Sequence, residues 1–325
     1  MRPGEYYNGR VIALQDDLKL LTKKRTMLAW LRFAVVTGII ACCNFFLPFG
    51  LLFCIIPGIL LLFLFTRLIF ADLNNKSLIE HTKKLLTVNE NELKALSHNY
   101  YHFAEGREYI PKEHFYANDL DIFGHASLYQ YINRTGSEMG SGSLAAWLSI
   151  PAEPETILKR QEAIKELVKQ SAWRQELQAY GLAKRIKLET TTRLQNWFAD
   201  DNRFINNKFW LSIRYLIPAV IITVLVLNIA DVLNNYARNY CLLASALLAL
   251  YISKKVTPLH QQVSKMTEEL EVLSDSINLI EKVHFTSPFL KDLQNEFVQQ
   301  KGKASRQINT LKKILERLDL RFNFV

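Results

Sequence analysis

The chain has 325 residues, a length that allows one large domain or two modest ones. Apolar residues make up 49% and charged residues 22%, with only 12 Gly and 9 Pro, which argues against a sheet-rich fold and favours helices that are partly soluble and partly in a membrane. The net charge of +9 allows three explanations: nucleic acid, an anionic membrane surface, or the basic flanks of membrane helices.

Residues 1–26 carry one apolar stripe, in which Leu14, Leu18 and Leu21 recur at steps of four and three. This spacing predicts an amphipathic N-terminal helix. Two apolar runs follow within residues 27–70, and only Leu-Pro-Phe-Gly separates them. Each run approaches the roughly 20 residues that cross a bilayer, so we expect a first transmembrane hairpin here.

Residues 71–208 are expected to form core helices, and their most specific pattern lies between Asp119 and Leu167. A turn at Asn133-Arg134-Thr135 precedes a glycine, a Trp-Leu pair and a proline-led helix; the positions that carry this pattern are Thr135, Gly140, Trp147, Pro151, Arg160 and Ala163. The pattern resembles the opening of the core, or lever, domain of MutS-type DNA mismatch repair proteins. It marks a fold, because none of these residues is chemically reactive.

Local signals within this stretch predict its helices. Ser127 or Ala126 should begin a short helix, residues 135–137 should end it, and Pro154 suits the first position of a later helix. We expect Gly140 to permit close helix packing. Leu144, Trp147 and Leu148 are expected to supply bulk for a core. In the later helix, Ile157, Ile164 and Leu167 should form the buried face.

Residues 209–252 hold two further apolar runs, at about 210–230 and 240–252. The second run is short for a complete span, and a tilted partner, local thinning of the bilayer or an extension through Tyr236 and Ala237 would each make up the difference. We expect a second transmembrane hairpin; a buried soluble hairpin is the alternative. Lys and Arg cluster before and after both hairpins, so their turns should face outward. The chain is therefore expected to be multi-pass in the inner (cytoplasmic) membrane, with both termini and the soluble part cytoplasmic.

Residues 253–325 are expected to return as lever and core helices. A coiled-coil seam with a heptad repeat runs from Leu259 to Ile280, and a last apolar stripe joins Ile308, Leu311 and Leu315. Such seams need partner helices, either from the same chain or from a second copy. The fold class is thus all-α: a long-helix core and lever bundle with two transmembrane helical hairpins.

No catalytic motif is apparent, because the sequence lacks a GxxxxGK[ST] phosphate loop and a nucleophile constellation. His98 and His102 have the i, i+4 spacing of a metal site, but no third ligand accompanies them, so an aromatic-rich helix end is the better interpretation and no metal site is predicted. We expect no cofactor in this chain.

The resemblance implies a membrane-anchored MutS-like variant that lacks the mismatch-reading domain, whose core couples an ATPase to duplex DNA. An ATPase domain binding ATP and Mg²⁺ would lie C-terminal to this chain and would provide the contact of a homodimer. Candidate contacts to DNA phosphates are Lys184, Arg185, Lys187, Lys301, Lys303 and Arg306. The alternative is a membrane scaffold that binds protein partners through its helical seams without DNA; a transporter is disfavoured by the lack of paired intramembrane charges.

Overall fold

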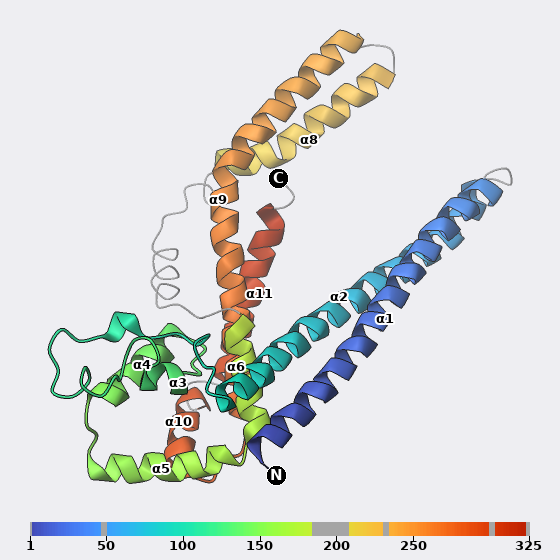
Figure 1. Cartoon of the computed structure of the whole chain (residues 1–325). Helices are drawn as coiled ribbons and strands as arrows, with labels where there is room; N and C mark the ends of the chain where they lie inside the picture. The colour runs from blue at the N-terminus through green and yellow to red at the C-terminus, as the bar shows by residue number, and fades with distance from the viewer. Residues whose placement is uncertain (1, 47–50, 184–207, 230–233, 299–302, 323–325) are drawn as a thin grey trace. The chain divides into compact units, whose positions relative to one another are not determined.

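The computed structural model describes residues 2–46, 51–183, 208–229, 234–298 and 303–322 (Figure 1). The chain forms two compact units, residues 1–183 and 184–325. The described residues form helices joined by turns, with no strand among them, so the all-α prediction is confirmed.

Two long helices, α1 (Pro3–Phe46) and α2 (Leu51–Leu96), run side by side in the first unit (Figure 1). Both are long and apolar enough to cross a membrane, with mean hydropathy of 1.4 and 2.0 in their most apolar windows. Only 11% and 6% of those windows are buried, whereas the core helix of a soluble protein would be mostly buried. Both helices continue without a break into the polar part of the unit, where Leu14 and Leu85 share a small core with Ala179.

A buried polar cluster joins the two helices near the predicted membrane boundary. Asp72 of α2 is 8% exposed, and its Oδ2 lies 3.1 Å from a guanidinium nitrogen of Arg32 on α1, with Arg25 Nε 3.9 Å from the other oxygen. One turn further along α2, the buried Asn75 donates from Nδ2 to the Leu21 carbonyl at 2.9 Å. These contacts fix the register of α1 against α2.

The rest of the first unit consists of a 3₁₀ turn, η2 (Arg107–Tyr109), and the helices α3 (Leu128–Ile132), α4 (Glu138–Ser149), α5 (Pro154–Val168) and α6 (Ser171–Ala183). Ser127 caps α3 by accepting from the Gln130 amide, and Ser137 caps α4 in the same way from Gly140. Pro154 occupies the start of α5. The predicted starts at Ser127 and Pro154 are therefore confirmed. α3 ends at Ile132, earlier than the break expected at residues 135–137, and those residues lie in the link between α3 and α4.

α6 packs along the polar half of α2. The buried amides of Asn89 and Gln175 face each other: Gln175 Nε2 donates to Asn89 Oδ1 at 2.9 Å, and Asn89 Nδ2 also donates to the Leu85 carbonyl at 2.8 Å. Earlier on α2, His81 Nε2 lies 2.7 Å from the carboxylate of Glu176, which follows Gln175 on α6. Polar pairs inside an apolar contact set the register of the two helices, since a shift would leave buried groups unpaired.

One sequence prediction fails in α5. Ile157 and Ile164, expected in the buried face, are 42% and 57% exposed, and Val168 on the same stripe is 61% exposed. The buried residue of α5 is Ala163, on another side of the helix. Apolar spacing locates a stripe on a helix but does not say whether a partner covers it.

The second unit contains α8 (Lys208–Ile229), α9 (Asn235–Lys282), α10 (Pro288–Val298) and α11 (Ala304–Phe322). α9 begins at Asn235, so the helix includes Tyr236 and Ala237, the extension that was one of the three possibilities for the short apolar run. The same helix then continues through the heptad seam. α11 covers that seam: Leu270 of α9 and Leu315 of α11 are 4% and 0% exposed. The partner of this part of the seam is a helix of the same chain.

Candidate functional site

The polar side chains of the turn at residues 133–137 form a hydrogen-bond network with one another and with α4. Asn133 Oδ1 accepts from the Thr135 amide at 3.0 Å and from the Thr135 hydroxyl at 2.7 Å. The Thr135 hydroxyl also lies 2.6 Å from Ser141 Oγ on α4, and Ser141 is fully buried. Asn and Thr suit this turn because their short side chains bond to the nearby backbone. The turn is therefore a rigid link between α3 and α4.

The same turn approaches α6 backbone to backbone. A Cβ added to Gly136 would lie 2.6 Å from the Cα of Gly181, and a Cβ on Gly181 would lie 2.5 Å from the Cα of Gly136. Real Cβ atoms do not approach other atoms this closely. Gly140, predicted to permit close helix packing, instead faces its own helix cap, where a Cβ would meet Ser137 Oγ at 3.0 Å. The close approach thus belongs to Gly136 and Gly181.

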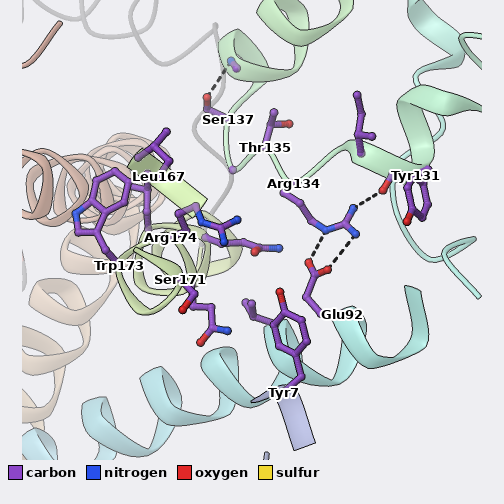
Figure 2. Close-up of a pocket in the computed structure, with 17 residues that line it drawn as sticks. Tyr7, Glu92, Tyr131, Arg134, Thr135, Ser137, Leu167, Ser171, Trp173 and Arg174 are labelled. Atoms are coloured by element: carbon purple, nitrogen blue, oxygen red, sulfur yellow. Dashed lines mark hydrogen bonds and ion pairs between the residues drawn. The ribbon is translucent and has the colours of Figure 1, made fainter. Parts of the chain in front are cut away.

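Arg134 ties the turn to α2. Its guanidinium pairs with both carboxylate oxygens of Glu92, with Nε at 2.5 Å from Oε1 and Nη2 at 3.2 Å from Oε2 (Figure 2). The carbonyl of Tyr131 accepts from Nη1 at 2.8 Å, and the guanidinium lies 3.6 Å from the centre of the Phe103 ring. Both charged side chains are mostly buried, at 25% and 18% exposure. This bidentate pair connects the turn at residues 133–137 with α2, the second helix of the first apolar hairpin.

A double-mutant cycle tests that connection. Arg134→Lys is expected to lower the free energy of unfolding by about 2 kcal/mol, because an ammonium cannot pair with both carboxylate oxygens in the planar two-bond geometry or stack its plane on the ring. Glu92→Gln should cost a similar amount, and the double variant should cost less than the sum of the two. Denaturant unfolding of the detergent-solubilised chain measures all three; strict additivity would show that the pair contributes no coupling energy.

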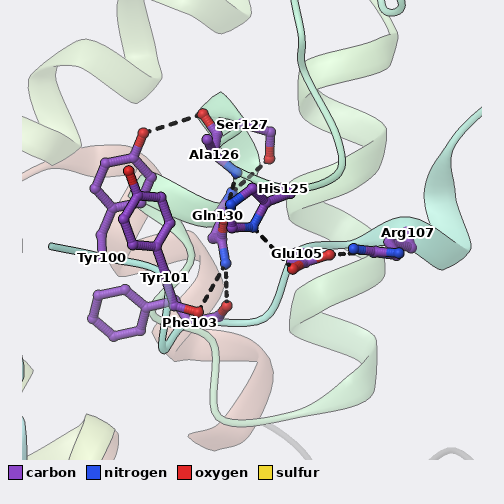
Figure 3. A network of polar contacts seen from close by, with 9 residues as sticks. All are labelled: Tyr100, Tyr101, Phe103, Glu105, Arg107, His125, Ala126, Ser127 and Gln130. Atoms are coloured by element: carbon purple, nitrogen blue, oxygen red, sulfur yellow. Dashed lines mark hydrogen bonds and ion pairs between the residues drawn. The ribbon is translucent and has the colours of Figure 1, made fainter.

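The backbone at Phe103 is held by a buried side-chain amide (Figure 3). Gln130 is fully buried, and its Nε2 donates to the carbonyls of Tyr101 at 3.1 Å and Phe103 at 2.8 Å, while its Oε1 accepts from the Ala126 amide at 2.8 Å. In the same loop the hydrogen bond from Arg107 lowers the pKa of the Glu105 carboxyl, and His125 adds to that effect. The segment after α2 is thereby fastened to α3.

The other motif residues serve packing. The Arg160 guanidinium of α5 lies 4.1 Å from the centre of the Trp147 ring of α4, so these two motif residues form a cation–π contact. Trp147 is nevertheless 55% exposed. Pro151 lies in the link between α4 and α5, and Ala163 is 4% exposed.

A cleft of about 640 Å³ opens beside the turn, and residues of the turn and of α1 to α6 line it (Figure 2). Tyr7 of α1 and Glu92 of α2 lie on one side, and Arg174 and Gln178 of α6 on another. Burial raises the pKa of the Tyr7 phenol and the Glu92 carboxylate raises it further, while the Arg174 guanidinium opposes both. The Tyr7 hydroxyl therefore remains a neutral hydrogen-bond donor at physiological pH.

The candidate phosphate-binding residues are only partly described. Lys184, Arg185, Lys187 and Lys301 lie outside the described residues. Lys303 and Arg306 lie at the first turn of α11, and both are exposed. The neighbouring Ser305 has no free donor for a ligand, because its amide and hydroxyl both donate to the Glu281 carboxylate, at 3.0 and 2.6 Å. Lys303 and Arg306 are accessible to a ligand, and whether they contact DNA stays a prediction.

The histidine pair does not lie on a helix. α2 ends at Leu96, His98 has a positive φ of 61°, and the His102 ring packs 4.1 Å from the Phe103 ring. The i, i+4 spacing therefore does not bring the two imidazoles onto one helical face. In the described part of the chain, no group of three or more His, Cys, Asp or Glu residues is placed to hold a metal ion.

Tyr7, Glu92, Arg174 and the glycine pair were missed by sequence reasoning. Tyr7 and Glu92 are ordinary residues of long helices, and nothing in their local sequence predicts a turn at residue 134 as their neighbour. A cation at residue 134 within a helix-breaking turn was the available signal, since such a residue needs an acidic partner when buried. Comparison of the chain with family models, with characterised proteins and with solved structures finds no match.

Proposed function

We propose that this chain is the membrane-anchored core and lever part of a MutS-like, ATP-dependent machine that acts on duplex DNA, with the ATPase supplied by a domain C-terminal to it. The two apolar hairpins insert into the cytoplasmic membrane, and both termini and the helical core lie on the cytoplasmic side. This proposal joins the MutS-like pattern of residues 119–167 to the architecture of the long helices.

One observation carries the proposal. α1 and α2 extend without a break from exposed apolar halves to polar halves, and the polar half of α2 packs against α6 and carries Glu92, the partner of Arg134. Apolar surface of this extent is not left in water by a stable protein, so a bilayer is its natural environment. A rigid helix transmits displacement along its length, which suits an anchored lever.

The second unit has the same design. α9 passes from an apolar half through residue 252 into the seam that α11 covers. Each hairpin would therefore deliver helices directly into a helical bundle on the cytoplasmic side. By analogy with the family, nucleotide binding in the ATPase would close a homodimer and shift these helices between two positions.

Salt-dependent binding of duplex DNA tests the proposal that the chain acts on DNA. The detergent-solubilised chain is expected to bind a fluorescent duplex with an affinity that falls steeply as salt rises, because phosphate contacts release counterions. Joint replacement by Gln of Lys184, Arg185, Lys187, Lys301, Lys303 and Arg306 should weaken binding and flatten the salt slope by about one for each phosphate that is no longer bound. The matched control replaces six exposed lysines of the first unit: Lys19, Lys83, Lys94, Lys112, Lys159 and Lys165.

The second candidate is a membrane scaffold that binds a protein partner and no DNA. The exposed apolar stripe of α5, formed by Ile157, Ile164 and Val168, favours it, since exposed apolar surface of this kind marks contact sites. If the six-site variant and its control bind duplex as the parent chain does, the six residues are a solvated face and not the DNA contacts. If the parent chain shows no salt-sensitive binding of duplex, the scaffold function replaces the DNA function.

A further inference from the structure

The cleft of about 640 Å³ in the first unit has the size of a small-molecule site, and neither the packing of the turn nor the anchoring of the hairpin requires it. Its walls come from six helices, from Tyr7 near the start of α1 to Gln178 in α6. A cavity formed by so many elements is defined by the fold as a whole, as ligand sites are.

The charges around the cleft do not balance. Arg134 is neutralised by its two-oxygen pair with Glu92. Arg174 is different: its side chain extends from α6 toward Arg134, and among the described residues no carboxylate or carbonyl binds its guanidinium (Figure 2). With one carboxylate and two guanidinium groups, the lining carries a net positive charge of one. A guanidinium without a partner in a cleft is a site for an anion, and its planar fork fits a carboxylate or a phosphate.

Neutral donors accompany the free cation. The Tyr7 hydroxyl points into the same space, and the raised pKa of this phenol keeps its proton in place (Figure 2). The Gln178 amide lines the cleft from α6, one helical turn after Arg174. Trp173 and Leu177 supply apolar wall. A few fixed polar groups set among apolar side chains are typical of small-ligand pockets.

We propose that this cleft binds a small molecule that carries a carboxylate or phosphate group, with Arg174 as the cationic anchor and the Tyr7 hydroxyl and Gln178 amide as neutral donors. The ligand is expected to bridge α6 and the first turns of α1. The proposal is independent of the proposed function, because it concerns other residues than the predicted DNA contacts and a ligand of a different class.

Isothermal titration of the full, detergent-solubilised chain tests this site, with inorganic phosphate and citrate as separate probes and sodium chloride holding the ionic strength constant. At least one probe is expected to bind saturably. Arg174→Gln should weaken that binding about tenfold or more, as the loss of a charge-assisted hydrogen bond does. Tyr7→Phe should weaken it less. Lys165→Gln, which removes one exposed charge from α5, should leave it unchanged.

The outcomes separate clearly. Saturable binding of phosphate alone assigns a phosphate group to the ligand, and binding of citrate alone assigns carboxylates. Equal binding by the parent chain, Arg174→Gln and Lys165→Gln would overturn the proposal, since the anion would then be held without the cleft. Absence of saturable binding by both probes would also overturn it. Arg174 is exposed, so its replacement should leave unfolding unchanged, and the unfolding midpoint of each variant verifies this.

Discussion

Asp72→Ala is expected to lower the free energy of unfolding of the detergent-solubilised chain by about 3 kcal/mol, because removing one partner of a buried ion pair leaves the other uncompensated. Arg32 would be deprived of the oxygen 3.1 Å away, and it lies within the predicted first membrane span, where water cannot replace that partner. The expected value lies at the lower end of the range for buried pairs, since Arg25 is half exposed and can turn to solvent. Denaturant unfolding followed by circular dichroism measures the change.

The matched control is Asp16→Ala on α1. Asp16 pairs with Lys19 at 2.8 Å, a shorter distance than either contact of Asp72, but the two side chains are 62% and 77% exposed. An exposed pair contributes about 0–1 kcal/mol, so this change should be nearly silent. If both aspartates cost the same, the cluster at Asp72 does not fix the register of the hairpin.

Gly136→Ala and Gly181→Ala are each expected to destabilise the first unit by about 2–3 kcal/mol or more, because each methyl group would collide with a backbone atom that no side-chain rotation can move. The Cβ of either alanine would lie within 2.6 Å of the opposite Cα. Relief requires the turn to move away from α6, which should also disturb the Arg134–Glu92 pair on its other side. Unfolding of each variant, followed by denaturant titration, gives the cost.

Gly9→Ala supplies the control of opposite sign. Gly9 lies within α1, and apart from the backbone of its own helix and the adjacent residues no atom comes within 4 Å of the position its Cβ would take. Alanine in an open helical position stabilises by about 0.5–1 kcal/mol relative to glycine. Should Gly136→Ala and Gly9→Ala change stability in the same direction, the backbone contact between the turn and α6 does not exist in solution.

The helices themselves were predictable because their signals are local. Runs of apolar residues, the cap at Ser127, the break at residues 135–137 and Pro154 each act within a few residues of the structure they specify. The seam at Leu270 was predictable for the same reason, although the helix that packs on it was not. Two helix partners were possible from the pattern, and only the fold shows that Leu315 of the same chain fills the position.

The contacts that define the site could not be predicted, because they join residues far apart in the chain. Glu92 and Arg134 are 42 positions apart, and Gly136 and Gly181 meet only because α6 returns to the turn. The close approach was expected at Gly140 because that glycine lies inside a helix, where space for a neighbour is the usual reason for its presence. The prediction for Ile157 and Ile164 failed for a related reason. An apolar stripe is buried only where another element packs on it, and the sequence of the stripe does not say which element that is.

Flotation of duplex DNA with the reconstituted chain tests the central claim most directly. The full chain is reconstituted into vesicles of zwitterionic phosphatidylcholine, mixed with fluorescent duplex at low salt and centrifuged through a density gradient. We expect protein and DNA to float together, and DNA alone to be released as salt is raised. Protein that floats without DNA would contradict the DNA function and favour the scaffold; protein that stays at the bottom would contradict membrane anchoring itself.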